Sequence, residues 1–182
     1  YRNILILEDD ALFDHNILNP KIIRDIENLY KTTKVNLFNL GPGFNLIHPK
    51  NMLFDNYNCK QLFFCYVTHA CIYSKEYRNI YYNSYNKKGV RNIGYDEDIN
   101  ILKNGPIYMY NKPIAYQPFV NTENNSNWEV FGIKTSKMFD YLHENIFRVD
   151  FYNEPIKSFK KTNRIVFLLN IILYLLVLLI IY

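Results

Sequence analysis

The three cysteines of this chain show none of the patterns that indicate a zinc site or a disulfide framework. Cys59, Cys65 and Cys71 are spaced by six residues, so the sequence has no Cys-x-x-Cys pair. An odd number of cysteines also gives no fully paired set of disulfides. Cys65 and Cys71 lie in an apolar, aromatic stretch, and we expect them to pack in the core as small hydrophobic residues.

A strong charge imbalance is absent as well. The net charge of +4 owes much to one basic cluster near the C-terminus, and the remainder of the 182 residues is nearly balanced. The sequence therefore gives no electrostatic support for nucleic-acid binding. Hydrophobic residues make up 49% of the chain, which is enough for one globular domain with a core.

The first informative motif lies at the beginning of the chain. The apolar run Ile4 to Leu7 is followed directly by Glu8, Asp9 and Asp10. Four consecutive apolar residues predict a strand that is buried on both faces within a parallel sheet. Carboxylates at the carboxyl end of such a strand lie where open α/β sheets bind ligands. A divalent metal that carries substrate phosphates would neutralise them; the alternative is a strand that enters a solvated loop.

The rest of the chain alternates between helical and strand patterns. We expect helices over residues 20–31, 75–85, 96–103 and 136–147, and strands over residues 35–40, 61–73, 107–110 and 114–117. Asn19-Pro20 and Ser74 are helix-start signals, whereas residues 44–58 look like an irregular loop. Strands that alternate with helices predict an α/β fold with a mostly parallel sheet.

The longest apolar run lies at the C-terminus. Ile165 to Tyr182 contains no charge and a single amide, Asn170, and it meets the lower length limit for a membrane-spanning helix. The run lacks the polar face that a soluble core helix would show. We therefore expect a transmembrane helix over residues 165–182.

A basic collar precedes this run, and it sets the expected domain organisation. The collar consists of Lys157, Lys160, Lys161 and Arg164. Clustered basic residues beside a span tend to stay cytoplasmic, although a luminal domain is a serious alternative. We expect a globular domain over residues 1–150, a basic linker over 151–164 and a single-pass C-terminal anchor.

Four segments occur in an order that resembles a known family. They are Glu8-Asp9-Asp10, then Thr68-His69-Ala70-Cys71-Ile72-Tyr73-Ser74-Lys75, then Gly94-Tyr95-Asp96-Glu97-Asp98-Ile99, and finally Pro113-Ile114-Ala115-Tyr116-Gln117-Pro118. This order resembles glycosyltransferase family 25, which includes lipooligosaccharide and procollagen galactosyltransferases. The resemblance covers Ile4 to about Thr122. It implies a GT-A fold, a nucleotide-sugar donor, a divalent metal and inversion at the anomeric carbon.

The resemblance also implies site residues. Asp10, with Asp9 or Glu8 assisting, would hold Mn²⁺ or Mg²⁺ and the donor diphosphate, because a bound metal neutralises the departing group. We take His69 and Gln117, together with Glu8 and Asp9, as substrate-binding residues. From the residues alone, a structural histidine of an apolar strand is the better interpretation of His69, and Gln117 is equally a hydrogen-bonding residue at a strand end.

An inverting sugar transfer also needs a general base for the acceptor hydroxyl. Asp96 matches the family's Val-Asp position and is our choice for the base, with Asp98 as the reserve. An aspartate before a helix is also a routine N-cap, and that alternative stays open. Tyr95 stands where the family has valine, which would change the acceptor side.

The family also carries a segment before its Glu-Asp-Asp strand, with the nucleotide-base pocket. This chain does not begin with Met, and its first strand begins at residue 2, so we expect a fragment or a remnant without a complete donor site. The sequence predicts a membrane-anchored glycosyltransferase that transfers a sugar, with galactose as one candidate, to a glycan, lipid or protein hydroxyl. The alternatives are a degenerate, inactive binding module and a metal-dependent phosphohydrolase, against which the lack of a histidine-rich metal set argues.

Overall fold

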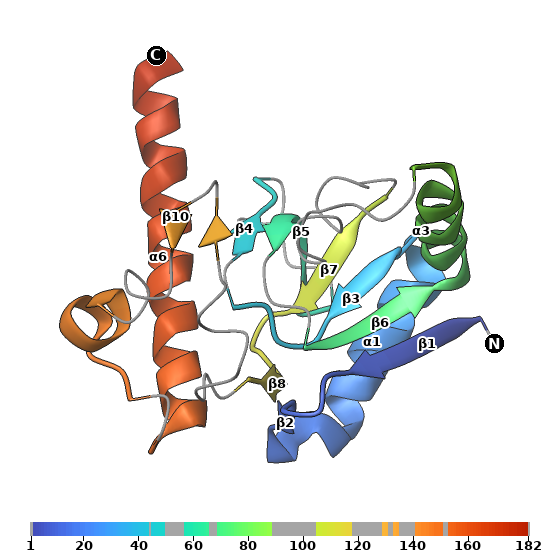
Figure 1. Cartoon of the computed structure of the whole chain (residues 1–182), viewed down its shortest axis with the longest axis horizontal. Helices are drawn as coiled ribbons and strands as arrows, with labels where there is room; N and C mark the ends of the chain where they lie inside the picture. Colours follow the sequence, from blue (N-terminus) through green and yellow to red (C-terminus); the bar gives the residue numbers. More distant parts are fainter. Residues whose placement is uncertain are drawn as a thin grey trace.

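The computed structural model describes residues 2–43, 45–49, 57–65, 69–88, 105–117, 129–130, 133–134, 141–150 and 153–181. Within these residues a six-stranded sheet has the order β1-β6-β3-β7-β5-β4, and the long helix α6 stands beyond its β4 edge (Figure 1). The sheet strands are β1 (Asn3–Leu7), β3 (Leu37–Asn39), β4 (Asn45–Ile47), β5 (Cys59–Cys65), β6 (Ala70–Ser74) and β7 (Ile107–Tyr110). The longer helices are α1 (Pro20–Thr32), α3 (Lys75–Lys88) and α6 (Pro155–Ile181).

Short elements complete the described chain. Strand β2 (Leu12–Phe13) pairs with β8 (Ala115–Tyr116), and β9 (Glu129–Val130) pairs with β10 (Ile133–Lys134). The 3₁₀-helix η1 (His15–Leu18) precedes α1, and the π-helix η3 (Leu142–Phe147) covers part of the helix expected over residues 136–147. The helix expected over residues 96–103 lies outside the described residues.

The mixed α/β class is confirmed, but the expectation of a mostly parallel sheet is wrong. Of the five pairings in the sheet that the described residues form, only β3 with β7 is parallel. Hydrophobic patterns report which residues are buried, not the direction in which a strand runs. Strands β1, β3 and β7 nevertheless point the same way, because β6 lies antiparallel between β1 and β3. Their carboxyl ends therefore lie at one end of the sheet.

Strand β1 is an edge strand of this sheet, and its side chains are not buried on both faces as predicted. Leu5, Ile6 and Leu7 are each exposed by 44–47%. The apolar run was consistent with a central strand and with a half-covered edge strand alike, because both need β-forming apolar residues.

Two apolar clusters fill the two faces of the sheet. The first lies beneath α1 and includes Ile22, Leu29, Phe38, Tyr108, Tyr110 and Cys59. The second includes Leu37, Leu62, Tyr73, Ile107, Met109, Cys65 and Cys71, together with Tyr77 of α3. Cys65 and Cys71 are fully buried and unbridged, as the sequence predicted.

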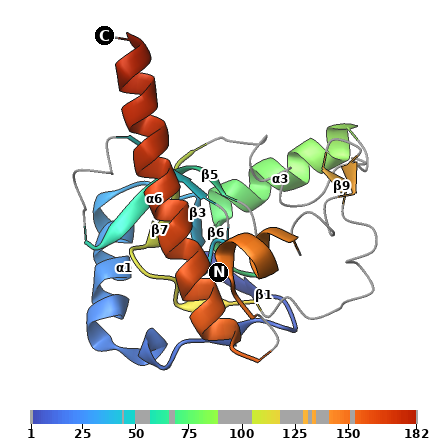
Figure 2. The ribbon, with the colours of Figure 1, turned by 90° about the vertical axis from the view of Figure 1, so that its left-hand side faces the viewer.

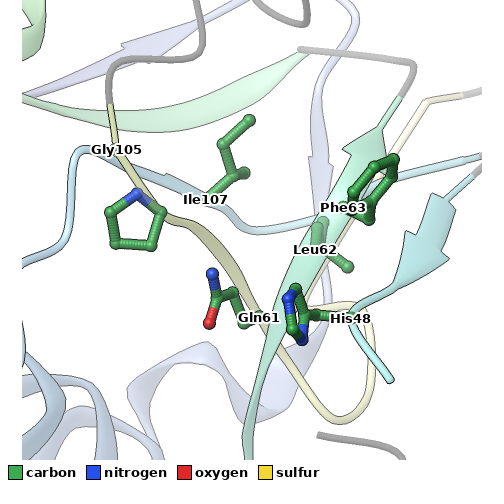
Figure 3. A pocket seen from close by; sticks show the side chains of 7 residues that line it. His48, Gln61, Leu62, Phe63, Gly105 and Ile107 are labelled. Atoms are coloured by element: carbon green, nitrogen blue, oxygen red, sulfur yellow. The ribbon is translucent and has the colours of Figure 1, made fainter. Parts of the chain in front are cut away.

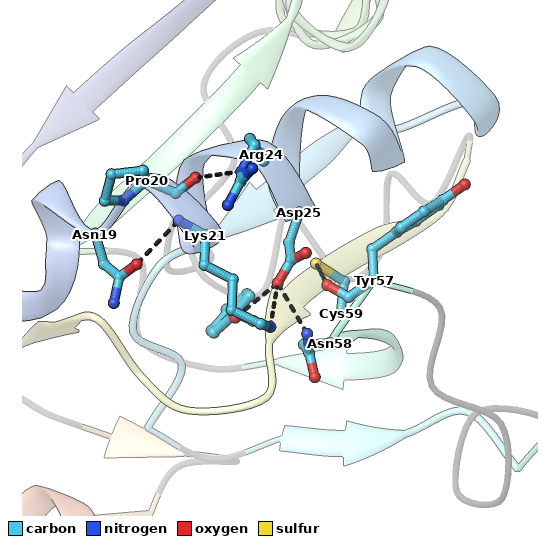
Figure 4. A network of polar contacts seen from close by, with 9 residues as sticks. Asn19, Pro20, Lys21, Arg24, Asp25, Tyr57, Asn58 and Cys59 are labelled. Atoms are coloured by element: carbon cyan, nitrogen blue, oxygen red, sulfur yellow. Dashed lines mark hydrogen bonds and ion pairs between the residues drawn. The ribbon is translucent and has the colours of Figure 1, made fainter.

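Helix α1 begins where the sequence placed it and is bound to the sheet by one carboxylate. The Asn19 side chain accepts a hydrogen bond from the Lys21 N–H at 2.9 Å, which caps the helix. Oδ2 of Asp25 accepts hydrogen bonds from Lys21 Nζ at 3.0 Å, Asn58 Nδ2 at 2.8 Å and the Tyr110 hydroxyl at 2.9 Å (Figure 4). These bonds connect α1 to the start of β5 and to β7.

Two further expectations concern local structure. Ser74 caps α3 as predicted, because its Oγ accepts a hydrogen bond from the Tyr77 N–H at 3.1 Å. Strand β4, in contrast, lies inside the segment that was expected to be an irregular loop.

Helix α6 begins at Pro155, inside the segment expected to be a basic linker. One part of the helix packs on the domain and the other part is exposed. Its first half packs on the domain through the buried side chains of Ser158, Phe159, Thr162, Val166 and Asn170. The part of α6 beyond Tyr174 projects clear of the domain (Figures 1 and 2). Among the described residues it is the one helix long and apolar enough to cross a membrane, over Ile156–Ile180.

Candidate functional site

The acidic segment forms a tight turn directly after β1. The Glu8 N–H donates to the His69 carbonyl oxygen at 2.8 Å, and the Ala11 N–H donates to the Glu8 carbonyl oxygen at 3.2 Å. Asp9 and Asp10 occupy the centre of this turn, which we call the acidic turn (Glu8–Ala11). The Asp9 residue is exposed, whereas Asp10 is partly buried.

Gln117 contacts the acidic turn although the two are far apart in the sequence. It follows β8, and the pairing of β8 with β2 places it beside the turn that precedes β2. Its Nε2 donates to Glu8 Oε2 at 3.1 Å and to Asp10 Oδ2 at 3.0 Å. A side-chain amide has two N–H donors, so one nitrogen serves both carboxylates. The structure thus brings together three residues that the sequence singled out. Gln117 lies 109 positions after Glu8 and 107 positions after Asp10 in the chain.

Asp10 retains capacity for a ligand. Its Oδ1 is buried and has no hydrogen-bond partner among the residues that the structure describes. A buried carboxylate oxygen without a partner is costly, and a cation or an N–H donor of a ligand would satisfy it.

The donor set suits a hard divalent metal that also binds phosphate. Over the described ranges there is no group of three or more His, Cys, Asp or Glu side chains that could hold a metal by itself. Mg²⁺ is commonly bound by one or two carboxylates, with water and substrate phosphate as its other ligands. Glu8 and Asp10, joined by one amide, fit that arrangement rather than an all-protein cage.

His69 lies beside the acidic turn and is fully buried. Burial lowers the pKa of His69 to about 4, although the Ala115 carbonyl and the Asp10 carboxylate favour the protonated ring. Neither ring nitrogen makes a hydrogen bond of acceptable geometry with another described residue. His69 is therefore a neutral imidazole at pH 7, packed edge-on against Phe159 of α6.

The loop after β3 packs closely against His69 and β8. A Cβ atom at Gly41 would lie 2.0 Å from the Ala115 carbonyl oxygen and 2.6 Å from His69 Nε2. The Asn39 side chain holds this loop by accepting the Gly41 N–H at 2.9 Å. Only glycine fits here, because any side chain would displace the backbone that leads to Gln117.

A second carboxylate, which the sequence did not single out, supports β8. Asp14 Oδ2 accepts a hydrogen bond from the Tyr116 hydroxyl at 2.9 Å and forms an ion pair with Lys160 Nζ at 2.9 Å. Its Oδ1 accepts from the backbone N–H of Asn16 at 2.9 Å. Burial by itself would raise the pKa of Asp14, but these donors outweigh burial and hold it well below its usual range. Burial and the adjacent carboxylate raise the pKa of Tyr116.

A shallow pocket lies at the other end of the sheet. Its volume is about 280 Å³, and it is lined by His48, Gln61, Leu62, Phe63, Gly105, Pro106 and Ile107 (Figure 3). It lies at the amino end of β7, whereas the acidic turn lies at the carboxyl end of β1. The two strands run in the same direction, so the pocket and the acidic turn are separate.

Asp96 and Asp98, the proposed base and its reserve, lie outside the described residues and remain predictions from sequence. Comparison of the chain with protein-family models, with characterised proteins and with solved structures finds no match. The functional assignment therefore rests on the geometry of the acidic turn and on the order of the sequence motifs.

Proposed function

We propose that the acidic turn and Gln117 form the diphosphate end of a nucleotide-sugar site, in a membrane-anchored glycosyltransferase that acts with inversion. The observation that carries this proposal is the double hydrogen bond from Gln117 to Glu8 and Asp10. It joins the first and last of the motifs on which the family resemblance rests. These motifs follow one another along the chain in the order of the family, and their contact in space is an independent observation that supports the proposal.

The residues of the chain have distinct tasks in this proposal. Asp10 supplies the partly buried carboxylate, whose Oδ1 has no partner among the described residues, and Gln117 fixes the orientation of the Glu8 and Asp10 carboxylates. A bound Mn²⁺ or Mg²⁺ would neutralise the leaving nucleoside diphosphate. His69 stays neutral, so it adds no positive charge that would compete with the metal. Asp96 would accept the proton of the acceptor hydroxyl, with Asp98 as the alternative.

Calorimetric titration with uridine or guanosine diphosphate, with and without Mn²⁺, tests the site. We expect Mn²⁺-dependent binding that Asp10→Asn weakens by at least about tenfold, because changes around metal ligands commonly cost 10–100-fold in affinity. Gln117→Leu should weaken it less, since that side chain only orients the carboxylates. Glu27→Gln is the matched control: it removes an exposed carboxylate on α1 whose partner is the neighbouring Lys31, at 4.0 Å.

Equal binding by the wild-type and Asp10→Asn proteins would remove the metal site from the proposal. Diphosphate binding without sugar transfer from any common donor would instead favour the degenerate binding module.

A further inference from the structure

The inward face of α6 is bound to the domain well inside the apolar run. Asn170 Oδ1 accepts the Ile47 N–H at 2.9 Å, and its Nδ2 donates to the carbonyl oxygens of Asn45 at 2.9 Å and Val166 at 2.8 Å. The Tyr174 hydroxyl donates to the Ile47 carbonyl oxygen. The one amide of the apolar run is thus satisfied by the edge strand β4 and is only 4% exposed.

These bonds limit where lipid can reach this face of the helix. A membrane span that began at Ile165 would pull Asn170 and Tyr174 away from β4. It would leave the edge groups of Ile47 unpaired and place an amide in hydrocarbon, where unsatisfied polar groups are costly. With the bonds intact, the inward face first becomes available to lipid after Tyr174.

The outward face of α6 changes character much earlier. Lys157, Lys161 and Arg164 are exposed and lie on the same helical face as Leu168 and Ile172, because they are three or four residues apart. Leu168 is 56% exposed and Ile172 is 52% exposed. Basic side chains therefore give way to exposed leucine and isoleucine within about one turn. This is the order expected where long cationic side chains reach lipid headgroups and the next turn enters hydrocarbon.

Beyond Tyr174 the helix is apolar and exposed on every side. All side chains from Leu175 to Ile180 are exposed by 41–83%, and this part stands clear of the domain in both views (Figures 1 and 2). A helix that is hydrophobic all round needs an apolar environment all round. A second copy of the chain would cover one face, whereas a bilayer covers all of them.

We infer that α6 meets a lipid bilayer obliquely, with lipid beginning at Leu168 on the outward face and only after Tyr174 on the inward face. The offset from Leu168 to Leu175 corresponds to about 10 Å along the helix axis. The domain fills this offset, so the β4–β5 edge rests against the membrane surface. Tyr174 then lies at the interface, where tyrosine is enriched. This inference rests on the membrane anchoring proposed above and adds the orientation of the domain.

Depth-dependent quenching tests this orientation in the full chain. The three native cysteines are fully buried, so an environment-sensitive fluorophore can be placed on single introduced cysteines. The positions are Leu168→Cys, Phe63→Cys on β5 beside Ile47, and Leu18→Cys in η1, which lies near the N-terminal end of α6. The protein is reconstituted in phosphatidylcholine–phosphatidylserine vesicles that carry nitroxide on either the acyl chain or the headgroup.

We expect the label at position 168 to be quenched by acyl-chain nitroxide, the label at 63 by headgroup nitroxide, and the label at 18 by neither. Asn170→Leu should release β4 and reduce quenching at position 63 while position 168 stays quenched. Asn163→Leu is the matched control, because that amide donates to the Phe159 carbonyl of its own helix at 3.1 Å rather than to β4. Equal, low quenching at positions 63 and 18 would show a domain held away from the membrane and would overturn the inference.

A label at position 168 that is shielded from water but not quenched by lipid would indicate a second copy on α6, and would also overturn it. None of these readings involves nucleotide. If the labels show this orientation but the chain binds no diphosphate, the inferred orientation stands and the proposed glycosyltransferase function fails.

Discussion

The ring of Phe159 stands edge-on to the imidazole of His69, with ring centroids 5.9 Å apart and planes at 84°. Phe159 meets Tyr116 in the same way, at 5.4 Å and 84°. Edge-to-face pairs of this kind contribute about 0.5–1.5 kcal/mol beyond the area they bury. One side chain of α6 therefore packs against residues of two segments that frame the acidic turn.

The buried, neutral state of His69 predicts a specific pH dependence of stability. Its pKa is about 4 in the folded protein and about 6.5 when unfolded, so the unfolded chain binds more protons between these values. The contribution of neutral His69 to the free energy of unfolding should be fully present above about pH 6.5. The free energy of unfolding should then fall by up to roughly 3 kcal/mol as the pH drops to about 4. Thermal unfolding of the detergent-solubilised chain between pH 4 and 7 measures this slope.

His69→Gln should flatten the slope, because glutamine does not titrate. His15→Gln changes an exposed histidine in η1 and should leave the slope as it is. An unchanged slope in His69→Gln would mean that another group causes the pH dependence.

Gln117→Glu should place a third carboxylate against Glu8 and Asp10. Like charges this close repel, so the melting temperature should fall at pH 7 and recover as the carboxyl groups are protonated. Added Mn²⁺ should restore stability at pH 7 if the carboxylates share a metal. Gln61→Glu, on β5, is the matched control and should show neither effect. If pH and Mn²⁺ changed the melting temperature of Gln117→Glu no more than that of the wild type, the contact of Gln117 with Glu8 and Asp10 would be contradicted.

Asn170→Leu should destabilise the folded chain even though it makes the apolar run more hydrophobic. It removes both hydrogen bonds to β4, and each buried group left unpaired costs about 1–3 kcal/mol. Asn163→Leu, which leaves β4 untouched, should change the melting temperature little. The two variants are compared by thermal unfolding in the same detergent. A more stable Asn170→Leu would show that α6 is not bound to β4 through this side chain.

Gly41→Ala should be among the most damaging small substitutions in the chain. The new methyl group would lie 2.0 Å from the Ala115 carbonyl oxygen, and overpacking typically costs about 1–3 kcal/mol. Because that nearest atom belongs to the backbone, adding His69→Ala should recover little of the loss. A melting temperature close to that of the wild type, measured for the single variant, would contradict this packing.

Local signals were enough to place several elements. The caps at Asn19 and Ser74 depend on hydrogen bonds between residues two or three positions apart, and both helices begin where predicted. Strand direction depends on pairings between distant segments, such as β3 with β7, which no local pattern encodes. Strand β4 was missed because it is three residues long and is held at its outer edge by Asn170, 123 positions away.

The candidate site divides in the same way. The acidic turn and Gln117 could be named from sequence, because carboxylates at a strand end and a Gln-Pro strand are visible as motifs. The need for glycine at position 41 is visible only in the structure, because a Cβ atom there would clash with the backbone of Ala115, 74 positions later in the chain. The Asp14–Lys160 ion pair joins the first and last parts of the chain and left no local signal.

The contact of α6 with both Tyr116 and β4 also determines how a soluble form of this protein should be designed. Truncation before Ile165 would remove the apolar run but would also strip Val166 and Asn170 from the domain, exposing β4 as an aggregation-prone edge. Truncation after Tyr174 keeps those contacts and removes the segment that is exposed on all sides. Helix α6 and the domain therefore share one packed core, and a protease that cut between residues 155 and 164 would release an incomplete fold.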